Sequence, residues 1–421
     1  MIRLRPSIIV FFLFVVFRFT ASAQDSIYAR NVIKILTSPE FHGRGYAFKG
    51  DSIAADFISK EFTRFQLKNW TTDYYQFYTI STNVFEGNTK VDFGKNYSST
   101  SPSDALQIVA NSAQVKGKFK IIPYKMLLDN IQPSKVKNKF VVIDEAEERV
   151  VMSILYEPKG YICLRKNLNA YSPRMGRFQS NETNISLLKD SVLGTLKNIS
   201  IDLDARFIEN YQTQNVCGYI EGTLYPDSFF VIGAHYEHLG QIGADYIFYG
   251  ANDNAAGVAM LLDLARYFSL PENQPDYSIA FLAFSSEEIG LLGASFFVEN
   301  SPIPLENIKL MLNLDVMGTG EKGFTFVGGE VFTDEFNLFA EINTEKKHIE
   351  NLVPREMTAN SDHYPFYAKG CKSMFIFGMG KSGKYHHPSD TLENLSLGGY
   401  PNLFKLIVDY FIAKYHKVPL W

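Results

Sequence analysis

The sequence predicts an α/β fold, in which a mixed, mostly parallel, doubly wound sheet is flanked by helices and carries an inserted, mostly β domain. Two features predict this fold. From residue 214 onward, short apolar strands alternate with helices, which is typical of a sheet covered on both faces. Between about residues 85 and 210, short β-type runs such as KFKIIPY and KFVVIDE are separated by polar turns. A chain of 421 residues has room for two or three domains.

The N-terminus differs from the rest of the chain. Arginines precede an apolar run that ends in the small residues Ala-Ser-Ala at 21–23. This order is typical of a secretory signal peptide cleaved before Gln24. A membrane anchor is the alternative, but the run over 7–17 is shorter than the roughly 20 residues that a spanning helix needs. We therefore expect a secreted or periplasmic protein with no stable membrane span after cleavage.

Two amphipathic helices are expected before the inserted domain. SIYARNVIKILTS and GDSIAADFISKEFTRF repeat apolar residues at intervals of three and four, and the loop PEFHGRGYAF separates them. The predicted organisation is a signal peptide over 1–23, a discontinuous domain over 24–84 and 212–421, and an inserted β-rich domain over 85–211.

The second half of the chain repeats strand, loop and helix. The expected strands are NVCGYIEG, SFFVIGAH, SIAFLAF, IKLMLNLDV, FTFVGG and SMFIFGM. The expected helices are NAAGVAMLLDLARYF, GLLGASFFVEN, DEFNLFAEINTEKK and YPNLFKLIVDYFIAKYH. In such sheets, sites form at the carboxyl ends of the strands, where the chain leaves for the next helix.

Acidic residues and histidines follow five of these strand ends. Each has an ordinary explanation on its own: Asp253 is placed to cap a helix, and His235 is placed as a core histidine. Asp315, after an apolar strand, is costly unless it is paired or bound to a metal. Because the same edge receives every group, a shared site explains them better. The candidate residues there are His235, Glu237, His238, Asp253, Glu287, Glu288, Asp315, His386, His387 and Asp390.

The residue types in this set match zinc, which binds imidazole and carboxylate. Five candidate ligands exceed what one tetrahedral catalytic ion takes from a protein, whereas two ions about 3.5–4 Å apart that share a carboxylate would use all five. Asp253 is flanked by small residues, so we expect it to bridge the two ions. We expect the side chains of Glu287 and Glu288 to diverge, so that one binds metal and the other acts as general base.

Six motifs in order resemble the two-zinc aminopeptidase family, which also contains glutamate carboxypeptidases, glutaminyl cyclases and the non-catalytic transferrin receptor. They are GAHYEHLG, GANDNAAGVA, FSSEEIGLLG, LNLDVMG, SDHYPF and YHHPSDT. HGRG and GDSIAADFISKEF resemble the N-terminal segment of the same family, so the resemblance covers residues 26 to about 80 and 212 to 421. More weakly, the inserted segment is similar to a protease-associated domain. The resemblance implies a zinc aminopeptidase-like fold.

The resemblance also implies roles for single residues. It places the metal ligand four residues before Asp390, which favours His386 over His387. Glu237 stands where the family commonly has an aspartate that orients the first histidine, and its extra methylene bears on metal affinity. His363 looks like a family residue near the substrate, but a loop histidine bonded to its neighbour explains it equally well. The implied set is one zinc on His235 and Asp315, another on Glu288 and His386, Asp253 as bridge and Glu287 as general base.

The expected function is a secreted zinc-dependent metallopeptidase. The preferred activity is an aminopeptidase that removes N-terminal residues from peptides, through a two-zinc-activated water with Glu287 as base. A carboxypeptidase or dipeptidase is the alternative, but no obvious arginine cluster lies beside the ligand loops in the sequence. A glutaminyl cyclase would lack the equivalent of His235, and a non-catalytic binding protein would lack ligands.

Composition limits the partners. The net charge of −4 gives no basic field for nucleic acid, so peptides or small proteins are the expected substrates. The sequence leaves the side-chain specificity and the oligomeric state open. The separations of Cys163, Cys217 and Cys371 match no disulfide framework or zinc finger, so buried free thiols are expected.

Overall fold

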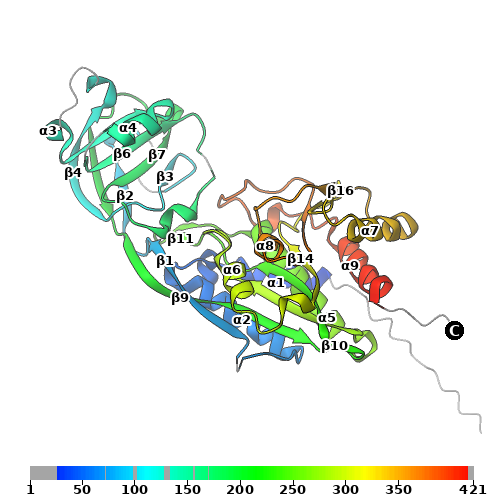
Figure 1. Cartoon of the computed structure of the whole chain (residues 1–421). Helices are drawn as coiled ribbons and strands as arrows, with labels where there is room; N and C mark the ends of the chain where they lie inside the picture. The colour runs from blue at the N-terminus through cyan, green and yellow to red at the C-terminus, as the bar shows by residue number, and fades with distance from the viewer. Residues whose placement is uncertain are drawn as a thin grey trace, which may run out of the picture.

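The computed structural model describes residues 26–415 except 72, 98–101, 128–132, 155–156 and 169. It contains an eight-stranded main sheet and a seven-stranded second sheet, which form the two parts of the molecule in Figure 1. The predicted signal peptide lies outside the described residues. None of the helices described is both long and apolar enough to cross a membrane.

The main sheet is mixed and mostly parallel, which confirms the predicted fold class. Its strand order is β1-β9-β13-β10-β14-β17-β15-β16. The four central strands, from β13 to β17, run parallel, whereas β9 and β15 are antiparallel to the central strands beside them. The carboxyl ends of the central strands therefore meet at one edge. The bounds are β1 Tyr75–Val84, β9 Arg206–Ile220, β10 Tyr225–His235, β13 Tyr277–Phe284, β14 Ile308–Leu314, β15 Phe324–Val327, β16 Leu352–Arg355 and β17 Ser373–Gly378.

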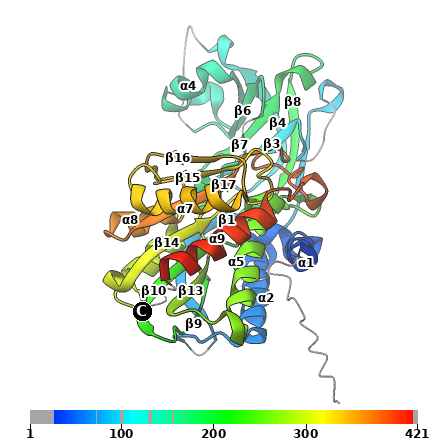
Figure 2. The same cartoon turned by 90° about the vertical axis from the view of Figure 1, so that its right-hand side faces the viewer.

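Helices cover both faces of this sheet, and the alternation of side chains along the strands explains how. Phe230 and Ile232 of β10 pack in a core with α1, α2, α5, α7 and α9, whereas Phe229 and Val231 pack in a core with α6 and α8. Successive strand residues point to opposite faces, so a strand buried on both faces needs a continuous apolar run. Figure 2 shows α5 and α9 against one face. The bounds are α1 Ser26–Leu36, α2 Gly50–Arg64, α5 Ala256–Phe268, α6 Leu292–Glu299, α7 Thr333–Lys346, α8 His363–Ala368 and α9 Tyr400–Tyr415.

The second sheet lies within the segment that the sequence predicts to be β-rich. Its order is β2-β8-β4-β5-β6-β7-β3. The strands before and after it, β1 and β9, pair antiparallel in the main sheet, so the chain leaves and returns through adjacent strands. β1 was not expected from the sequence. The bounds are β2 Thr89–Asp92, β3 Leu106–Ile108, β4 Val115–Pro123, β5 Lys139–Asp144, β6 Gly160–Arg165, β7 Thr183–Leu188 and β8 Asn198–Leu203, with short helices α3 Pro133–Val136 and α4 Glu148–Ile154.

The two sheets are joined by a shared apolar core as well as by the chain. The loop after β10 forms a small hairpin, β11 (Gln241–Ile242) and β12 (Tyr246–Ile247). Ile242 and Phe248 pack with the core of the second sheet. Because the same loop begins beside the strand ends of the main sheet, the second sheet is held close to that edge.

The three cysteines are buried and none forms a disulfide, as predicted. Burial raises the pKa of the Cys163 thiol to about 12. The thiolate is the reactive form of cysteine, so this thiol is chemically inert at neutral pH.

Candidate metal centre

The parallel strands bring the predicted site residues together. β10, β13, β14 and β17 each end at the same edge of the main sheet, and each is followed directly or within one loop by a histidine or a carboxylate. The turn that begins α5 supplies one more carboxylate. The cluster formed there contains His235, Asp253, Glu287, Glu288, Asp315 and His386.

Asp253 lies in a short π-helical turn, η8 (Ala251–Ala255), directly before α5. Two successive backbone N–H groups, the second that of Asp253, donate to the Asp390 carboxylate at 2.9 and 3.0 Å. The side-chain amide of Asn254 donates to the Leu314 carbonyl at the end of β14, at 2.9 Å. The turn is therefore fixed to two other parts of the same edge, and the position of the Asp253 carboxylate is fixed with it.

The small residues around Asp253 serve close packing. A Cβ on Gly250, whose φ is +56°, would lie 2.4 Å from the His238 ring. A Cβ on Gly257 would lie 2.2 Å from the Asn254 side-chain oxygen. The sequence predicted that small neighbours leave room for two ions, whereas the structure shows that they let the turn press against His238 and β14.

The two carboxylate oxygens of Asp253 face two different groups of residues. Oδ1 lies 3.4 Å from His235 Nε2, which in turn lies 3.2 Å from Asp315 Oδ1. Oδ2 lies 3.4 Å from His386 Nε2, which lies 2.9 Å from Glu288 Oε2. Each oxygen of this one carboxylate therefore belongs to a separate histidine–carboxylate pair.

Hydrogen bonds on the far side of each ring show which nitrogen is available to a metal. His386 Nδ1 lies 2.6 Å from the Tyr171 carbonyl and His235 Nδ1 lies 3.0 Å from the Glu237 carbonyl. A carbonyl only accepts, so each Nδ1 carries a proton, and in a neutral ring Nε2 then presents a lone pair. Both lone pairs would face carboxylate oxygens, an arrangement that is repulsive unless a cation lies between them.

The spacing of these atoms fits zinc. Tetrahedral zinc holds nitrogen and oxygen ligands at about 2.0–2.2 Å, which places neighbouring ligand atoms roughly 3.3 Å apart. The separations around His235 and His386 are 2.9 to 3.4 Å. Asp253, Glu288 and Asp315 are almost fully buried, and burying several carboxylates together requires positive charge. The residues present therefore fit zinc, and Asp253 faces both histidine–carboxylate pairs.

The close packing of histidines and carboxylates also shifts the pKa values of His386 and Glu288. Burial alone would lower the pKa of His386, but the carboxylates of Glu288 and Asp253 outweigh it and raise the pKa to about 11. Burial alone would raise the pKa of Glu288, but His386 and His238 bring it down to about 2. Glu288 is thus ionised, as metal binding requires of a carboxylate ligand.

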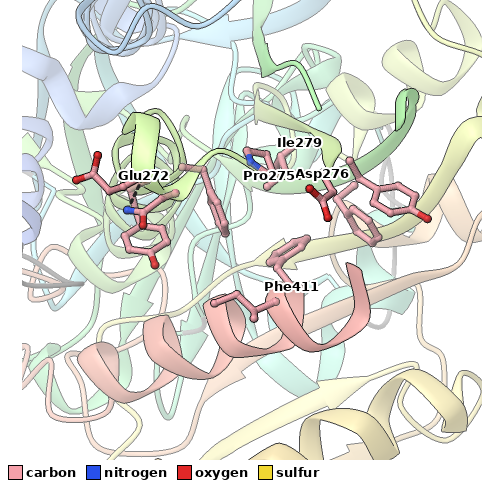
Figure 3. Close-up of a pocket in the computed structure, with 11 residues that line it drawn as sticks. Glu272, Pro275, Asp276, Ile279 and Phe411 are labelled. Carbon is pink, nitrogen blue, oxygen red and sulfur yellow. Dashed lines mark hydrogen bonds between the residues drawn. The ribbon is translucent and has the colours of Figure 1, made fainter. Parts of the chain in front are cut away.

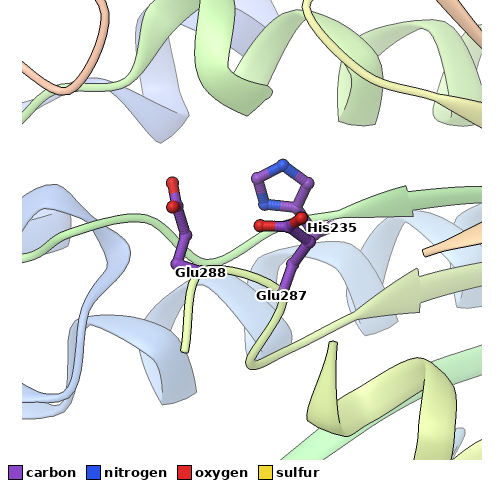
Figure 4. Close-up of side chains that lie close together, drawn as sticks. All are labelled: His235, Glu287 and Glu288. Atoms are coloured by element: carbon purple, nitrogen blue, oxygen red, sulfur yellow. The ribbon is translucent and has the colours of Figure 1, made fainter. Parts of the chain in front are cut away.

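Glu287 and Glu288 both point into the cluster, as Figure 4 shows, and each offers an oxygen within 4.8 Å of a His235 nitrogen. The sequence predicted that neighbouring side chains would diverge, but the turn after β13 brings both to one side. Ser286 has a φ of +64°, and this turn geometry changes the direction of the residues after it. Burial, and then the nearby carboxylate of Glu288, raise the pKa of Glu287 well above its usual range against the opposing effect of His235.

Residues 215–411 match the family model described as peptidase family M28. This match covers just under half of the chain. The chain is 31% identical over 206 residues to aminopeptidase YwaD of Bacillus subtilis strain 168, an alignment that covers 46% of this chain and 43% of that protein. It is 35% identical over 118 residues to a probable zinc metalloprotease of Pyrenophora teres f. teres, with 28% and 25% covered. The chain thus spans less than half the length of these curated relatives.

Solved structures share the whole fold. A zinc aminopeptidase from Bacillus subtilis superimposes with a TM-score of 0.68 at 19% identity, over 92% of this chain and 94% of that one. An aminopeptidase from Aneurinibacillus sp. strain AM-1 gives a TM-score of 0.64 at 17% identity, over 93% and 94%. At these identities the likeness establishes the fold.

Glu237 is fully buried beside the cluster and connects it to the turn after β13. Its Oε1 accepts a hydrogen bond from the backbone N–H of Glu288 at 2.9 Å. Its Oε2 lies 3.6 Å from His235 Nδ1, which is closer to the backbone carbonyl of Glu237 itself. The side chain therefore positions the Glu288 backbone, and the main chain orients His235.

Four residues that the sequence left without a role support this site. His238, fully within the cluster, has Nδ1 2.8 Å from Glu288 Oε1. Ser361 donates to the outer oxygen of Asp315 at 2.8 Å. The only sequence signal for them was their place in the motifs. The set is His238, Ser361, Asp390 and Arg44.

Arg44, in the HGRG segment, lies fully buried beneath the cluster. Its guanidinium donates to the carbonyls of Leu36, Tyr236, Tyr249 and Gly250 at 2.7 to 2.9 Å. Burial lowers the pKa of Arg44 to about 10, so it remains charged at neutral pH. It therefore joins the N-terminal segment to the two chain segments that present His235 and Asp253, and it supplies positive charge near the carboxylates of the cluster.

Two other histidines lie outside the ligand cluster. His363 is fully buried, and burial lowers its pKa to about 4. Neither carboxylate oxygen of Asp362 has a hydrogen-bond partner among the described residues, so the suggested bond from His363 to Asp362 is absent there. His387 pairs with Asp104 of the β-rich segment at 3.0 Å.

The structure also places two arginines beside the ligand loops, where the sequence predicted none. Arg174 and Arg177 belong to η6 (Pro173–Arg177), which follows β6 and lies before β7. Their guanidinium nitrogens lie 3.5 and 3.6 Å from the position that a Cβ on Gly290 would take. More than a hundred residues separate these arginines from Gly290 along the chain, so no local pattern predicts the contact.

A separate apolar pocket of about 90 Å³ lies away from this edge. It is formed where β13 begins and α9 approaches, and Figure 3 shows Phe411 of α9 below Pro275 and Asp276. It contains none of the candidate metal ligands. The chemistry therefore lies at the other ends of the strands.

Replacing Asp390 by asparagine is expected to weaken zinc binding by about 10- to 100-fold, the usual cost of removing a partner that orients a ligand. In the wild-type protein, two backbone N–H groups of the Asp253 turn donate to the two oxygens of Asp390. In the variant, one of these N–H groups would face the NH₂ group of asparagine, which cannot accept a hydrogen bond, so the turn loses part of its support. Competition with a chromophoric chelator measures the affinity. Asp245→Asn, on an exposed carboxylate, is the matched control, and an unchanged zinc affinity in Asp390→Asn would contradict the prediction.

Proposed function

We propose that the chain is a zinc-dependent aminopeptidase that holds two zinc ions and removes N-terminal residues from peptides. The observation that carries this proposal is the Asp253 carboxylate, whose two oxygens face two separate histidine–carboxylate pairs. The match of residues 215–411 to peptidase family M28 supports hydrolysis of peptide bonds. The names of the relatives, an aminopeptidase and probable zinc metalloproteases, support zinc and the exo-activity.

In the proposed site, His235 and Asp315 hold one ion, Glu288 and His386 hold the other, and Asp253 bridges them. When bound, zinc supplies Lewis-acid activation of the attacking water and of the scissile carbonyl. The protein residues supply the ligand geometry and the negative charge that keeps the ions in place. The almost complete burial of the ligands keeps bulk water away from them.

Glu287 is the proposed general base. It accepts a proton from the water as the water oxygen adds to the carbonyl carbon, and it gives that proton to the nitrogen as the C–N bond breaks. Burial and the nearby Glu288 carboxylate favour its protonated form, which is the form it has between these two transfers. The second zinc ion and nearby carboxylates would hold the free α-amine of the substrate, which gives exo-specificity.

We also propose that the mature enzyme is exported after cleavage before Gln24. In this proposal, residues 24–84 and 212–421 form the peptidase domain. Residues 85–211 form an inserted domain like a protease-associated domain, and the position of all seven strands of the second sheet within this range supports that boundary. N-terminal sequencing of the secreted protein would identify the cleavage site.

A panel of aminoacyl-p-nitroanilides tests the activity, with N-acetylated and C-terminal-reporter peptides beside it. We expect residues 24–421 to release the reporter from substrates with a free α-amine only. Hydrolysis of blocked peptides instead would move the assignment to a carboxypeptidase or an endopeptidase. A zinc-loaded protein that hydrolyses nothing would overturn the proposed function.

Removal of metal is expected to abolish hydrolysis. Treatment with a chelator should release about two zinc ions per chain, because two sets of ligands are present. Added zinc should restore activity in proportion to occupancy. Elemental analysis before and after dialysis, run beside the rate measurement, checks the prediction. Full activity of the metal-free protein would rule out a metallopeptidase.

A further inference from the structure

Two guanidinium groups lie beside the turn that carries the proposed general base. Arg177 Nη1 lies 3.5 Å, and Arg174 Nε and Nη2 lie 3.6 Å, from the position of a Cβ on Gly290. The backbone N–H of Gly290 donates to the Glu287 carbonyl at 2.8 Å. Three residues of chain span at most about 11 Å, so Gly290 lies within that distance of Glu287, about the length of two or three substrate residues.

The segment that carries these arginines is held against the metal centre. The Tyr171 carbonyl, three residues before Arg174, accepts the hydrogen bond from His386 Nδ1 at 2.6 Å. The Tyr171 ring stacks on Phe248, with ring centres 5.0 Å apart. The inserted segment therefore reaches the site through the same stretch of chain that presents the arginines.

Within the described part of the chain, neither arginine is held in an ion pair. Arg165, Arg206 and Arg266 pair with carboxylates elsewhere in the molecule. Arg174 and Arg177 are exposed, and neither has an ion pair with any residue that the structure describes. Two cationic groups that lie together beside a site, neither of them in an ion pair with a described residue, can receive an anion. The planar guanidinium matches a carboxylate.

We propose that Arg174 and Arg177 bind a carboxylate on the leaving-group side of the substrate, so that the enzyme acts preferentially on peptides with an acidic group within two or three residues of the scissile bond. The inference rests on the proposed function. The carboxylate belongs on the leaving-group side because the N-terminal residue occupies the metal cluster itself, whereas the arginines lie beside Gly290, three residues along the chain from Glu287. Its source is either the free C-terminus of a short peptide or an acidic side chain.

Matched substrate pairs separate the two sources. The N-terminal residue is the one that the p-nitroanilide panel ranks first, taken here as leucine. Leu-Ala is compared with Leu-Ala-amide for the terminal carboxylate, and Leu-Asp-amide with Leu-Asn-amide for a side-chain carboxylate. We expect the zinc-loaded enzyme to favour one carboxylate-bearing member by about 10-fold in kcat/KM, mainly through KM.

The double variant Arg174→Gln/Arg177→Gln is expected to lose this preference and to keep its rate on the leucine p-nitroanilide, which has no carboxylate. That retained rate shows that the variant is folded and holds its metal. Arg149→Gln is the matched control, because Arg149 is an exposed arginine of the same inserted segment, on α4, far from the main sheet in Figure 1. It should keep the wild-type preference.

Every outcome bears on the inference. A preference for Leu-Ala that the double variant loses identifies the terminal carboxylate, and a preference for Leu-Asp-amide that it loses identifies the side chain. Equal rates within both pairs, or a preference that survives in the double variant, overturn the role of the arginines and leave the aminopeptidase standing. No hydrolysis of any substrate by zinc-loaded enzyme overturns the proposed function and this inference with it.

Discussion

Asp253→Asn is expected to reduce the zinc content from two ions per chain to one or none and to lower kcat/KM by at least about 1000-fold. Each oxygen of Asp253 faces its own histidine–carboxylate pair, so one substitution disturbs both metal positions. Asparagine keeps the shape but loses the negative charge and one acceptor. Lewis-acid activation is worth several kcal/mol, and each 1.36 kcal/mol is a factor of ten in rate.

Elemental analysis of the purified variant and the rate on the best p-nitroanilide measure the two effects. Asp245→Asn is again the control, since that exposed carboxylate makes no contact with the cluster. Near-UV circular dichroism shows whether the variant is folded. A folded Asp253→Asn variant that keeps two zinc ions would contradict the bridging role, whatever its rate.

Glu287→Gln is expected to lower kcat by about 100- to 10,000-fold, the range that a positioned acid–base group contributes, with an unchanged zinc content. The amide has nearly the same size as the carboxyl group but cannot accept the proton. Glu287, Glu288 and His235 lie close enough together to form a metal site, so Glu287 has to be distinguished from a metal ligand. A lower rate with an unchanged zinc content makes that distinction.

The measurement pairs the steady-state rate with zinc stoichiometry. Glu299→Gln, an exposed glutamate at the end of α6, is the control. Loss of one zinc together with the rate would make Glu287 a ligand, and full activity would remove it from the mechanism.

Much of the site was predictable because its chemistry follows from strand ends. Parallel strands deliver the residues that follow them to one edge, so His235 and Asp315 could be placed together before any coordinates were known. The composition of the set, imidazole and carboxylate without thiol, indicated zinc. The motif order then distinguished His386 from His387, and the structure places His386, not His387, against Asp253 and Glu288.

Other features required the folded chain because their partners are far apart in sequence. Arg44 donates to carbonyls about 200 residues away. Helical and strand periodicity reflect only local spacing, so they do not predict such a contact. His238 was visible in its motif, but its bond to Glu288 depends on how two loops meet. The division of roles between Glu287 and Glu288 stays a prediction, because both offer an oxygen within 4.8 Å of a His235 nitrogen.

The sequence by itself determined the fold class, the strand ends that carry the chemistry and the identity of the candidate ligands. Local periodicity and short motifs depend only on residues that are close in the sequence, so they can be recognised from the sequence alone. Only the tertiary structure decided which oxygen of Asp253 faces which histidine and which segments lie over the site. Those facts arise where the inserted segment packs against the main sheet, and so Arg174 and Arg177, far from Gly290 in sequence, lie beside it in space.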